Sequence, residues 1–180
     1  MTGEAGWRYS VGMHNTAFIS LGGNLGDVRE TFRNALGMLS AEKGVNGITA
    51  SGLYRTEPQG DPDQPWFFNQ VGCLACSPDM RPEELLHILQ GIESRLGRVR
   101  DSARRFGPRS IDLDLLLFDS VVLSTAELIL PHPRMRERAF VLVPLLDLEP
   151  ELHFPDGTKA AEVLAGLNYT VTGNAVYQTA

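Results

Sequence analysis

The segment that most constrains the fold is Ile111 to Phe118, where aspartates alternate with aliphatic residues before a run of leucines. Successive side chains of a strand point to opposite faces, so Asp112 and Asp114 share one face, with Cα atoms ~6.5–7 Å apart. The aliphatic side chains are expected on the other face, in a core: Ile111, Leu113, Leu115 and Leu117. The segment therefore predicts a strand of a sheet with one buried face and two carboxylates on the other.

Apolar periodicity predicts the remaining elements. Strands are expected at residues 16–21, 45–54 and 67–77, and helices start at Asp27 and at Pro82. The order strand, helix, strand, strand, helix, strand predicts an α+β protein of the ferredoxin-like class. That fold has an antiparallel four-stranded sheet with two helices on one face. A C-terminal hairpin and short helices are expected after this core, at residues 121–123, 138–146 and 158–167.

The length of 180 residues suits one domain, expected at residues 15–167. Residues 1–14 look like a flexible leader, and 168–180 like a poorly ordered polar tail. The sequence contains no apolar run of membrane-span length and no signal-peptide pattern, so we expect a cytoplasmic protein, as a monomer. The net charge of −6 argues against a nucleic-acid partner.

Positive charge is nevertheless clustered next to the aspartates. Arginines crowd the segment before the Asp112 strand and a second, later segment: Arg95, Arg98, Arg100, Arg104, Arg105 and Arg109, then Arg134, Arg136 and Arg138. Two neighbouring carboxylates repel, and Mg²⁺ removes that repulsion while it also takes phosphate oxygens. Arginines would hold the remaining phosphate charge, as phosphoryl transfer requires. The alternative is a solvated basic loop beside two incidental aspartates.

Other residues extend this hypothesis. His132, between two prolines, could donate to a phosphate, or it is an exposed loop residue. A flat heterocycle could stack between aromatic rings such as Phe67 and Phe140 while Asn69 reads its edge, although both rings suit a core equally well. No P-loop motif occurs, and the glycines of residues 22–26 lack dinucleotide spacing, so tight-turn chemistry explains them better.

The two cysteines have the spacing of a redox pair or half of a zinc site. Cys73 and Cys76 lie within an apparent buried strand, however, where residues three apart point to opposite faces. We therefore expect two separate, buried structural thiols.

Several motifs in the same order resemble the hydroxymethyl-dihydropterin pyrophosphokinase (HPPK) family of folate synthesis. They include SLGGNLGD (20–27), YRTEPQG (54–60), DQPWFFN (63–69), FGPRSIDLDLL (106–116) and LPHPRMRERAF (130–140). The resemblance covers roughly residues 16–167. It implies that the protein transfers pyrophosphate from ATP to 6-hydroxymethyl-7,8-dihydropterin and releases AMP.

The resemblance also implies roles for individual residues. Asp112 and Asp114 would hold two Mg²⁺ ions, and the residues expected to be catalytic are Arg98, Arg109 and this aspartate pair. The residues expected to bind ATP are Gln90, Glu93, Arg98, Arg100, Arg109, Leu115, His132 and Arg138. Those expected to bind the pterin are Thr56, Pro58, Phe67, Asn69, Phe106 and Phe140.

Three positions depart from the family pattern: Gly23 stands where many members have Ser, Pro133 where some have Tyr, and Phe106 where the best-known members have Trp. Two other function classes stay open from the fold alone. An RNA-binding module would show aromatics and a basic face on the sheet. A small-molecule regulatory module would bind its ligand without a metal pair.

Overall fold

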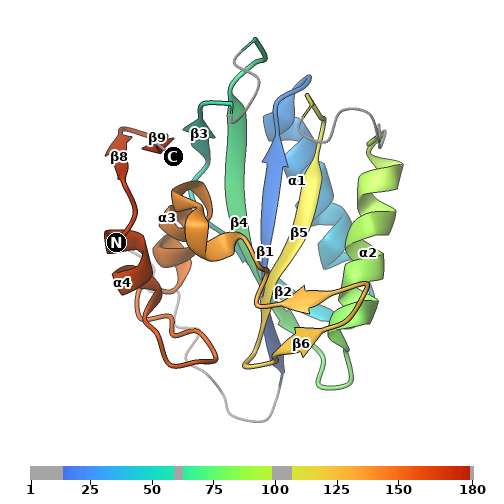
Figure 1. Cartoon of the computed structure of the whole chain (residues 1–180). Coiled ribbons are helices and arrows are strands. Elements are labelled where there is room, and N and C mark those ends of the chain that lie inside the picture. Colours follow the sequence, from blue (N-terminus) through green and yellow to red (C-terminus); the bar gives the residue numbers. More distant parts are fainter. Residues whose placement is uncertain (1–13, 59–62, 99–106, 179–180) are drawn as a thin grey trace, which may run out of the picture.

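The computed structural model describes residues 14–58, 63–98 and 107–178 (Figure 1). Strand β1 (Asn15–Gly23) lies between β4 (Phe67–Cys76) and the edge strand β5 (Asp112–Phe118) of the main sheet, and is antiparallel to both. The other strands of this sheet are β2 (Val45–Ala50), β3 (Tyr54–Thr56), β8 (Tyr169–Thr172) and β9 (Ala175–Gln178). A separate hairpin joins β6 (Leu123–Ser124) to β7 (Ile129–Leu130).

The sheet is larger than the four antiparallel strands expected from the sequence. Its order is β5-β1-β4-β3-β9-β8, with β2 also paired to β4, which makes seven strands. Strand β9 runs parallel to β3, so the sheet is mixed and the architecture is α+β. The expected strand at 45–54 is divided into β2 and β3, and the Ser51 hydroxyl between them accepts a hydrogen bond from Val71 N at 3.0 Å.

Helices cover both faces of the sheet (Figure 1). Helices α1 (Val28–Ser40) and α2 (Pro82–Arg95) pack on one face, as expected, and enclose the larger core with β1, β4 and β5. The Asp27 carboxylate caps α1 by accepting from Glu30 N at 3.0 Å, and Pro82 occupies the first turn of α2. The opposite face carries α3 (Ala139–Leu148), α4 (Ala160–Ala165) and the short 3-10 helix η1 (Met135–Glu137), which enclose a second core.

Strand β5 does not alternate along its whole length. Leu113 and Leu115 lie in the larger core as expected, but Leu117 lies in the second core. The pairing of β5 with β1 shifts between Phe18 and Ile19, so one β5 residue is left without a β1 partner and the later side chains exchange faces. The prediction for Leu117 was therefore wrong, whereas the aspartates precede the shift.

The C-terminal segment corrects a second expectation. Residues 168–178 are not a loose tail, because β8 and β9 form a hairpin whose second strand pairs with β3. Val176 is buried in the second core. The sequence here is polar and short of strong hydrophobic periodicity, so its order depends on pairing with a distant strand.

The cysteines confirm the prediction of two separate structural thiols, of which Cys76 is buried and Cys73 half-buried. Both thiols are free, with Cys76 in the larger core and Cys73 packed against the second core on the opposite face. Burial raises the pKa of Cys73 to about 11 and that of Cys76 to about 12, which keeps both protonated. Within the described residues, no helix combines the length and apolar character that a membrane span requires.

Candidate active site

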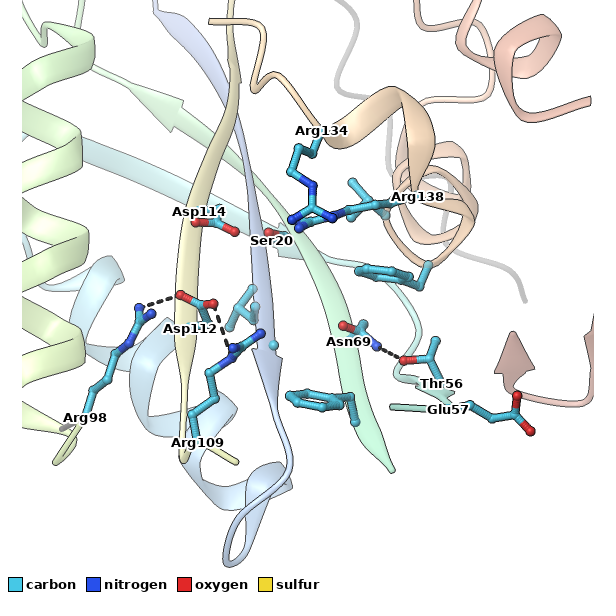
Figure 2. A pocket seen from close by; sticks show the side chains of 15 residues that line it. Ser20, Thr56, Glu57, Asn69, Arg98, Arg109, Asp112, Asp114, Arg134 and Arg138 are labelled. Atoms are coloured by element: carbon cyan, nitrogen blue, oxygen red, sulfur yellow. Dashed lines mark hydrogen bonds and ion pairs between the residues drawn. The ribbon is translucent and has the colours of Figure 1, made fainter. Parts of the chain in front are cut away.

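A cavity of about 400 Å³ lies on the sheet face that α3 covers, at the N-terminal end of that helix (Figure 2). Its floor comes from β1, β4 and β5, and its sides come from β3, the start of α3 and the segments that flank α2 and β5. The lining residues are Ser20, Leu21, Gly22, Thr56, Glu57, Phe67, Asn69, Arg98, Arg109, Asp112, Asp114, Arg134, Arg138, Phe140 and Val141.

The aspartate pair faces this cavity from the edge strand β5. Asp112 lies opposite Gly22 and Asp114 opposite Ser20 on β1, so small neighbours leave both carboxylates accessible. Burial, followed by the negative charge of Asp112, raises the pKa of the Asp114 carboxyl. The protein therefore holds two carboxylates together at an energetic cost that a bound cation would remove.

Two arginines oppose the charge of Asp112 (Figure 2). Arg98 forms an ion pair with one carboxylate oxygen, and Arg109 Nε lies 3.2 Å from the other. Arg98 also pairs with Glu93, which is 2% exposed. Because Glu93 accepts a hydrogen bond from Leu113 N at 2.7 Å, it links the end of α2 to β5 and anchors Arg98.

Asn24 positions the Arg109 segment, and sequence reasoning missed it. Its Oδ1 accepts from Arg109 N at 2.8 Å, and Asn24 N donates to Arg109 O at 2.9 Å. Its Nδ2 donates to Gln64 Oε1 at 3.2 Å and to Pro65 O at 2.9 Å. A Cβ on the preceding Gly23 would lie 2.5 Å from Ser110 O, so this glycine permits a close backbone approach rather than a turn.

The opposite side of the cavity is amide and aromatic. Asn69 Nδ2 donates to Thr56 Oγ1 at 2.8 Å, and both residues are buried. The rings of Phe67 and Phe140 line the same space. The Arg109 guanidinium carbon lies 5.0 Å from the Phe67 ring centre, and that of Arg138 lies 5.6 Å from the Phe140 ring centre.

Among the described residues, two buried arginine nitrogens make no hydrogen bond: Nε of Arg138, and Nε of Arg109, which meets Asp112 only as an ion pair. Burial, followed by the charge of Arg134, lowers the pKa of Arg138. Unused donors on cations that crowd together are a ready site for an anion. The charge is therefore divided within one cavity, with carboxylates on β5 and guanidiniums around them.

The structure brings most of the predicted site residues together. The cavity contains Thr56, Phe67, Asn69, Arg98, Arg109, Asp112, Asp114, Arg138 and Phe140. Pro58 lines a neighbouring cavity of about 690 Å³, which shares Arg138 and Phe140 with the first. Arg100 and Phe106 lie outside the described residues. Glu57 and Arg134 line the cavity as well; both lie in the motifs YRTEPQG and LPHPRMRERAF, but no site role was predicted for either.

Four residues expected at the nucleotide do not line the cavity. Leu115 lies in the larger core and Glu93 is buried as the partner of Arg98. Gln90 lies on α2, where its carbonyl accepts from Ser94 Oγ at 2.9 Å. His132 lies beside the cavity, and burial lowers its imidazole pKa against the opposing charge of Asp114.

The donor set fits a divalent cation bound jointly by protein and ligand. In the described part of the chain no group of three or more His, Cys, Asp or Glu side chains forms a complete protein metal site. Two carboxylates on one strand face are nevertheless what Mg²⁺ commonly takes from a protein, because phosphate oxygens and water supply the rest.

The fold and this cavity together define an α+β protein with charged and aromatic side chains gathered in one cavity. Comparison with known proteins makes this specific. Residues 18–150 match the family model for 7,8-dihydro-6-hydroxymethylpterin-pyrophosphokinase, and the chain belongs to this family.

Two relatives carry the name 2-amino-4-hydroxy-6-hydroxymethyldihydropteridine pyrophosphokinase. The protein from Methylorubrum extorquens is 42% identical over 152 residues, which cover 84% of this chain and 93% of the relative. The protein from Bacillus subtilis is 44% identical over 137 residues, which cover 76% and 79%.

Solved structures show a similar fold. A crystal structure of an HPPK-DHPS protein in complex with substrates superposes with a TM-score of 0.64 at 13% identity, over 91% of this chain. The wild-type Plasmodium falciparum HPPK-DHPS with pteroate gives a TM-score of 0.62 at 14% identity, over 90% of this chain. The chain spans about half of each of these longer chains, 48% and 47%.

Proposed function

We propose that this chain is an ATP-dependent pyrophosphokinase of folate synthesis, as its family membership implies. It would transfer the β,γ-pyrophosphoryl group of ATP to the hydroxymethyl group of 6-hydroxymethyl-7,8-dihydropterin. The single observation that carries the proposal is the shared cavity. It combines the carboxylate pair Asp112 and Asp114 with the amide and aromatic group of Thr56, Asn69, Phe67 and Phe140.

The pterin is expected in the amide and aromatic side of the cavity. Its flat ring would stack between Phe67 and Phe140, and the Asn69 amide would hydrogen-bond its polar edge. The Asn69–Thr56 hydrogen bond of 2.8 Å supports this role, because it fixes the amide before the ligand arrives. Pro58 and Phe106 would also contact the pterin.

The phosphates are expected on the charged side. Arg98, Arg109 and Arg138 would bind them, because their guanidiniums surround the carboxylate pair and two of their nitrogens make no hydrogen bond in the described chain. Arg100 would add a further cation. Gln90, Glu93, Leu115 and His132 would lie toward the nucleoside, outside this cavity.

Asp112 and Asp114 would together hold two Mg²⁺ ions. When bound, the metal neutralises phosphate charge and orients the transferred group. Arg98 and Arg109 currently neutralise Asp112, so ligand binding would redirect these guanidiniums from the carboxylate to the phosphates. The total charge of the cavity then changes little, because Mg²⁺ replaces the arginines at the aspartates and the phosphates replace the aspartates at the arginines.

In the proposed reaction the pterin hydroxyl oxygen attacks the β-phosphorus in line. The bond from the β-phosphorus to the α,β-bridging oxygen breaks, AMP leaves with that oxygen, and the hydroxyl proton passes to solvent. Positioning of the two substrates and stabilisation of phosphate charge by arginines would supply most of the catalysis.

The direct test measures AMP release from ATP and Mg²⁺, with and without 6-hydroxymethyl-7,8-dihydropterin. AMP that appears only with the pterin supports the proposal. AMP release at the same rate with and without the pterin, or no release at all, contradicts it.

Two finer points accompany the proposal. Strands β5, β1, β4 and β2, with α1 and α2, would be the ferredoxin-like unit, to which β3, β8 and β9 are added. That the protein acts as a cytoplasmic monomer stays a prediction.

A further inference from the structure

The β8–β9 hairpin lies beyond residues 18–150, the part of the chain that the family model covers. It nevertheless contacts the elements on both sides of the active-site cavity: β3, which carries Thr56, and the start of α3, which carries Arg138 and Phe140. The last described residue, Gln178, makes its contacts at the point where η1 meets α3.

The Gln178 side chain binds the peptide groups on either side of Arg138. Its Oε1 accepts from Ala139 N at 2.7 Å, and its Nε2 donates to Glu137 O at 2.6 Å. An amide side chain satisfies a donor and an acceptor at once, so the two bonds define its orientation. The backbone that carries Arg138 is thereby held from both ends.

This contact replaces a missing helix cap. Arg138 is the N-cap residue of α3, has an extended backbone, and makes no side-chain capping bond. Its side chain lines the cavity instead. The first N–H groups of a helix have no partner within the helix, so the free N–H of Ala139 needs another acceptor. Gln178, 39 residues later in the chain, supplies it.

The hairpin also holds the opposite side of the cavity. Strand β9 lies parallel to β3, with Val176 beside Thr56, and Arg55 N donates to Asn174 O at 2.7 Å. The Tyr177 ring packs edge-on against the Trp66 ring, with the ring centres 5.7 Å apart. Trp66 directly precedes Phe67, which lines the cavity. One short element therefore connects β3 to the start of α3.

We propose that Gln178 is a positioning residue for the active site. Through its bonds to the backbone on either side of Arg138, it sets the placement of Arg138 and of Phe140, the residue that follows Ala139. This inference rests on the proposed function, in which Arg138 meets phosphate and Phe140 stacks on the pterin. Gln178 itself touches neither substrate. The neighbouring cavity, which Gln178 lines together with Arg138 and Phe140, leaves room for both side chains to move if the amide is removed.

The test compares three variants of the full chain. Gln178→Ala removes both hydrogen bonds, whereas Gln178→Glu keeps an acceptor for Ala139 N and loses the donor to Glu137 O. Thr172→Ala is the matched control, because this exposed residue lies in the same hairpin and pairs with Ala175. Steady-state kinetics at 25 °C give kcat and the KM for the pterin, and amide hydrogen exchange follows Ala139.

We expect Gln178→Ala to raise the KM for the pterin about tenfold and to lower kcat, as removal of a partner behind a functional group commonly does. Gln178→Glu should fall between this variant and the wild type, and Thr172→Ala should match the wild type. The Ala139 amide should exchange faster in Gln178→Ala alone among the three.

A KM that stays at the wild-type value in Gln178→Ala would overturn the proposal, even if kcat falls, because loss of folded protein lowers kcat without altering KM. Unchanged exchange at Ala139 would overturn it as well. Failure of the wild type to form AMP would instead contradict the proposed function, and the Ala139 exchange still tests the contact in that case.

Discussion

The two sides of the cavity are held in different ways. On the charged side, Asp112 is bound by Arg98 and Arg109, whose guanidiniums reach it from segments outside the sheet. On the amide and aromatic side, Asn69 and Thr56 lie on paired strands and bind each other directly. Figure 2 shows the two groups on opposite sides of the same space.

This difference indicates how each side meets its ligand. A guanidinium that exchanges a carboxylate for a phosphate keeps a charged hydrogen-bond acceptor, so phosphates can displace Asp112 from the arginines. A hydrogen bond between adjacent strands is fixed by the backbone, so the pterin would meet a preformed surface. Damage to the charged side should therefore lower kcat, whereas damage to the amide side should raise the KM for the pterin.

The largest expected effect comes from the aspartates. Asp112→Ala or Asp114→Ala should lower kcat by about 10³-fold or more, because the metal that orients the phosphates loses its protein ligands. Steady-state AMP formation measures this. Asp79→Ala, in an exposed turn, is the control and should keep full activity. Wild-type turnover in either aspartate variant would refute the assignment of the metal site.

Arg98→Ala should lower kcat by about 10²–10³-fold, comparable with removal of one donor to a developing charge. Arg95→Ala provides the contrast. Arg95 is the last residue of α2 and Arg98 lies three residues beyond it, but the ion pair of Arg95 with Glu42, at 2.9 Å, is far more exposed than the pairs of Arg98. Arg95→Ala should leave kcat within about twofold, since exposed pairs contribute little. Equal losses in both variants would mean that helix stability, not phosphate binding, explains the effect.

Asn69→Ala should raise the KM for the pterin by roughly 10–100-fold, since an unpaired polar group in a dry site costs about 1–3 kcal/mol. The neighbouring Gln70→Ala is the matched control, because Gln70 Nε2 donates to Ser51 O and does not line the cavity. The KM from pterin titrations at saturating ATP separates the two. A fall in kcat without a change in KM would remove the distinction between the two sides.

The sequence predicted the charged residues of the cavity better than the backbone contacts that position them. Asp112 and Asp114 follow from strand alternation, and the nearby arginines from charge clustering, so these features are local. Asn24 and Gln178 act through backbone groups far along the chain, and no spacing rule connects them to their partners. The parallel pairing of β9 with β3 escaped prediction for the same reason.

The smallest expected effect concerns the free energy of unfolding. Burial and the charge of Asp112 raise the pKa of Asp114, so the ionised carboxyl destabilises the folded protein without metal. Asp114→Asn removes that charge and should raise Tm by a few degrees in metal-free buffer at pH 7, since ~1 kcal/mol corresponds to about 2–4 °C at this size. Asp79→Asn should leave Tm unchanged.

The pH dependence of this Tm difference gives the sharper test. The unfolded carboxyl ionises near 3.8 and the folded one at a higher pH, so the folded state loses stability as the pH rises through this interval. The advantage of Asp114→Asn in Tm should therefore be largest at pH 7 and shrink toward pH 4, as thermal unfolding across that range would show.

Because Mg²⁺ stabilises a state that binds it, Mg²⁺ should raise the wild-type Tm more than that of the variant. An Asp114→Asn variant that is less stable than the wild type at pH 7 without metal would show that Asp114 supports the fold, and that the charged side holds no stored repulsion for a cation to relieve.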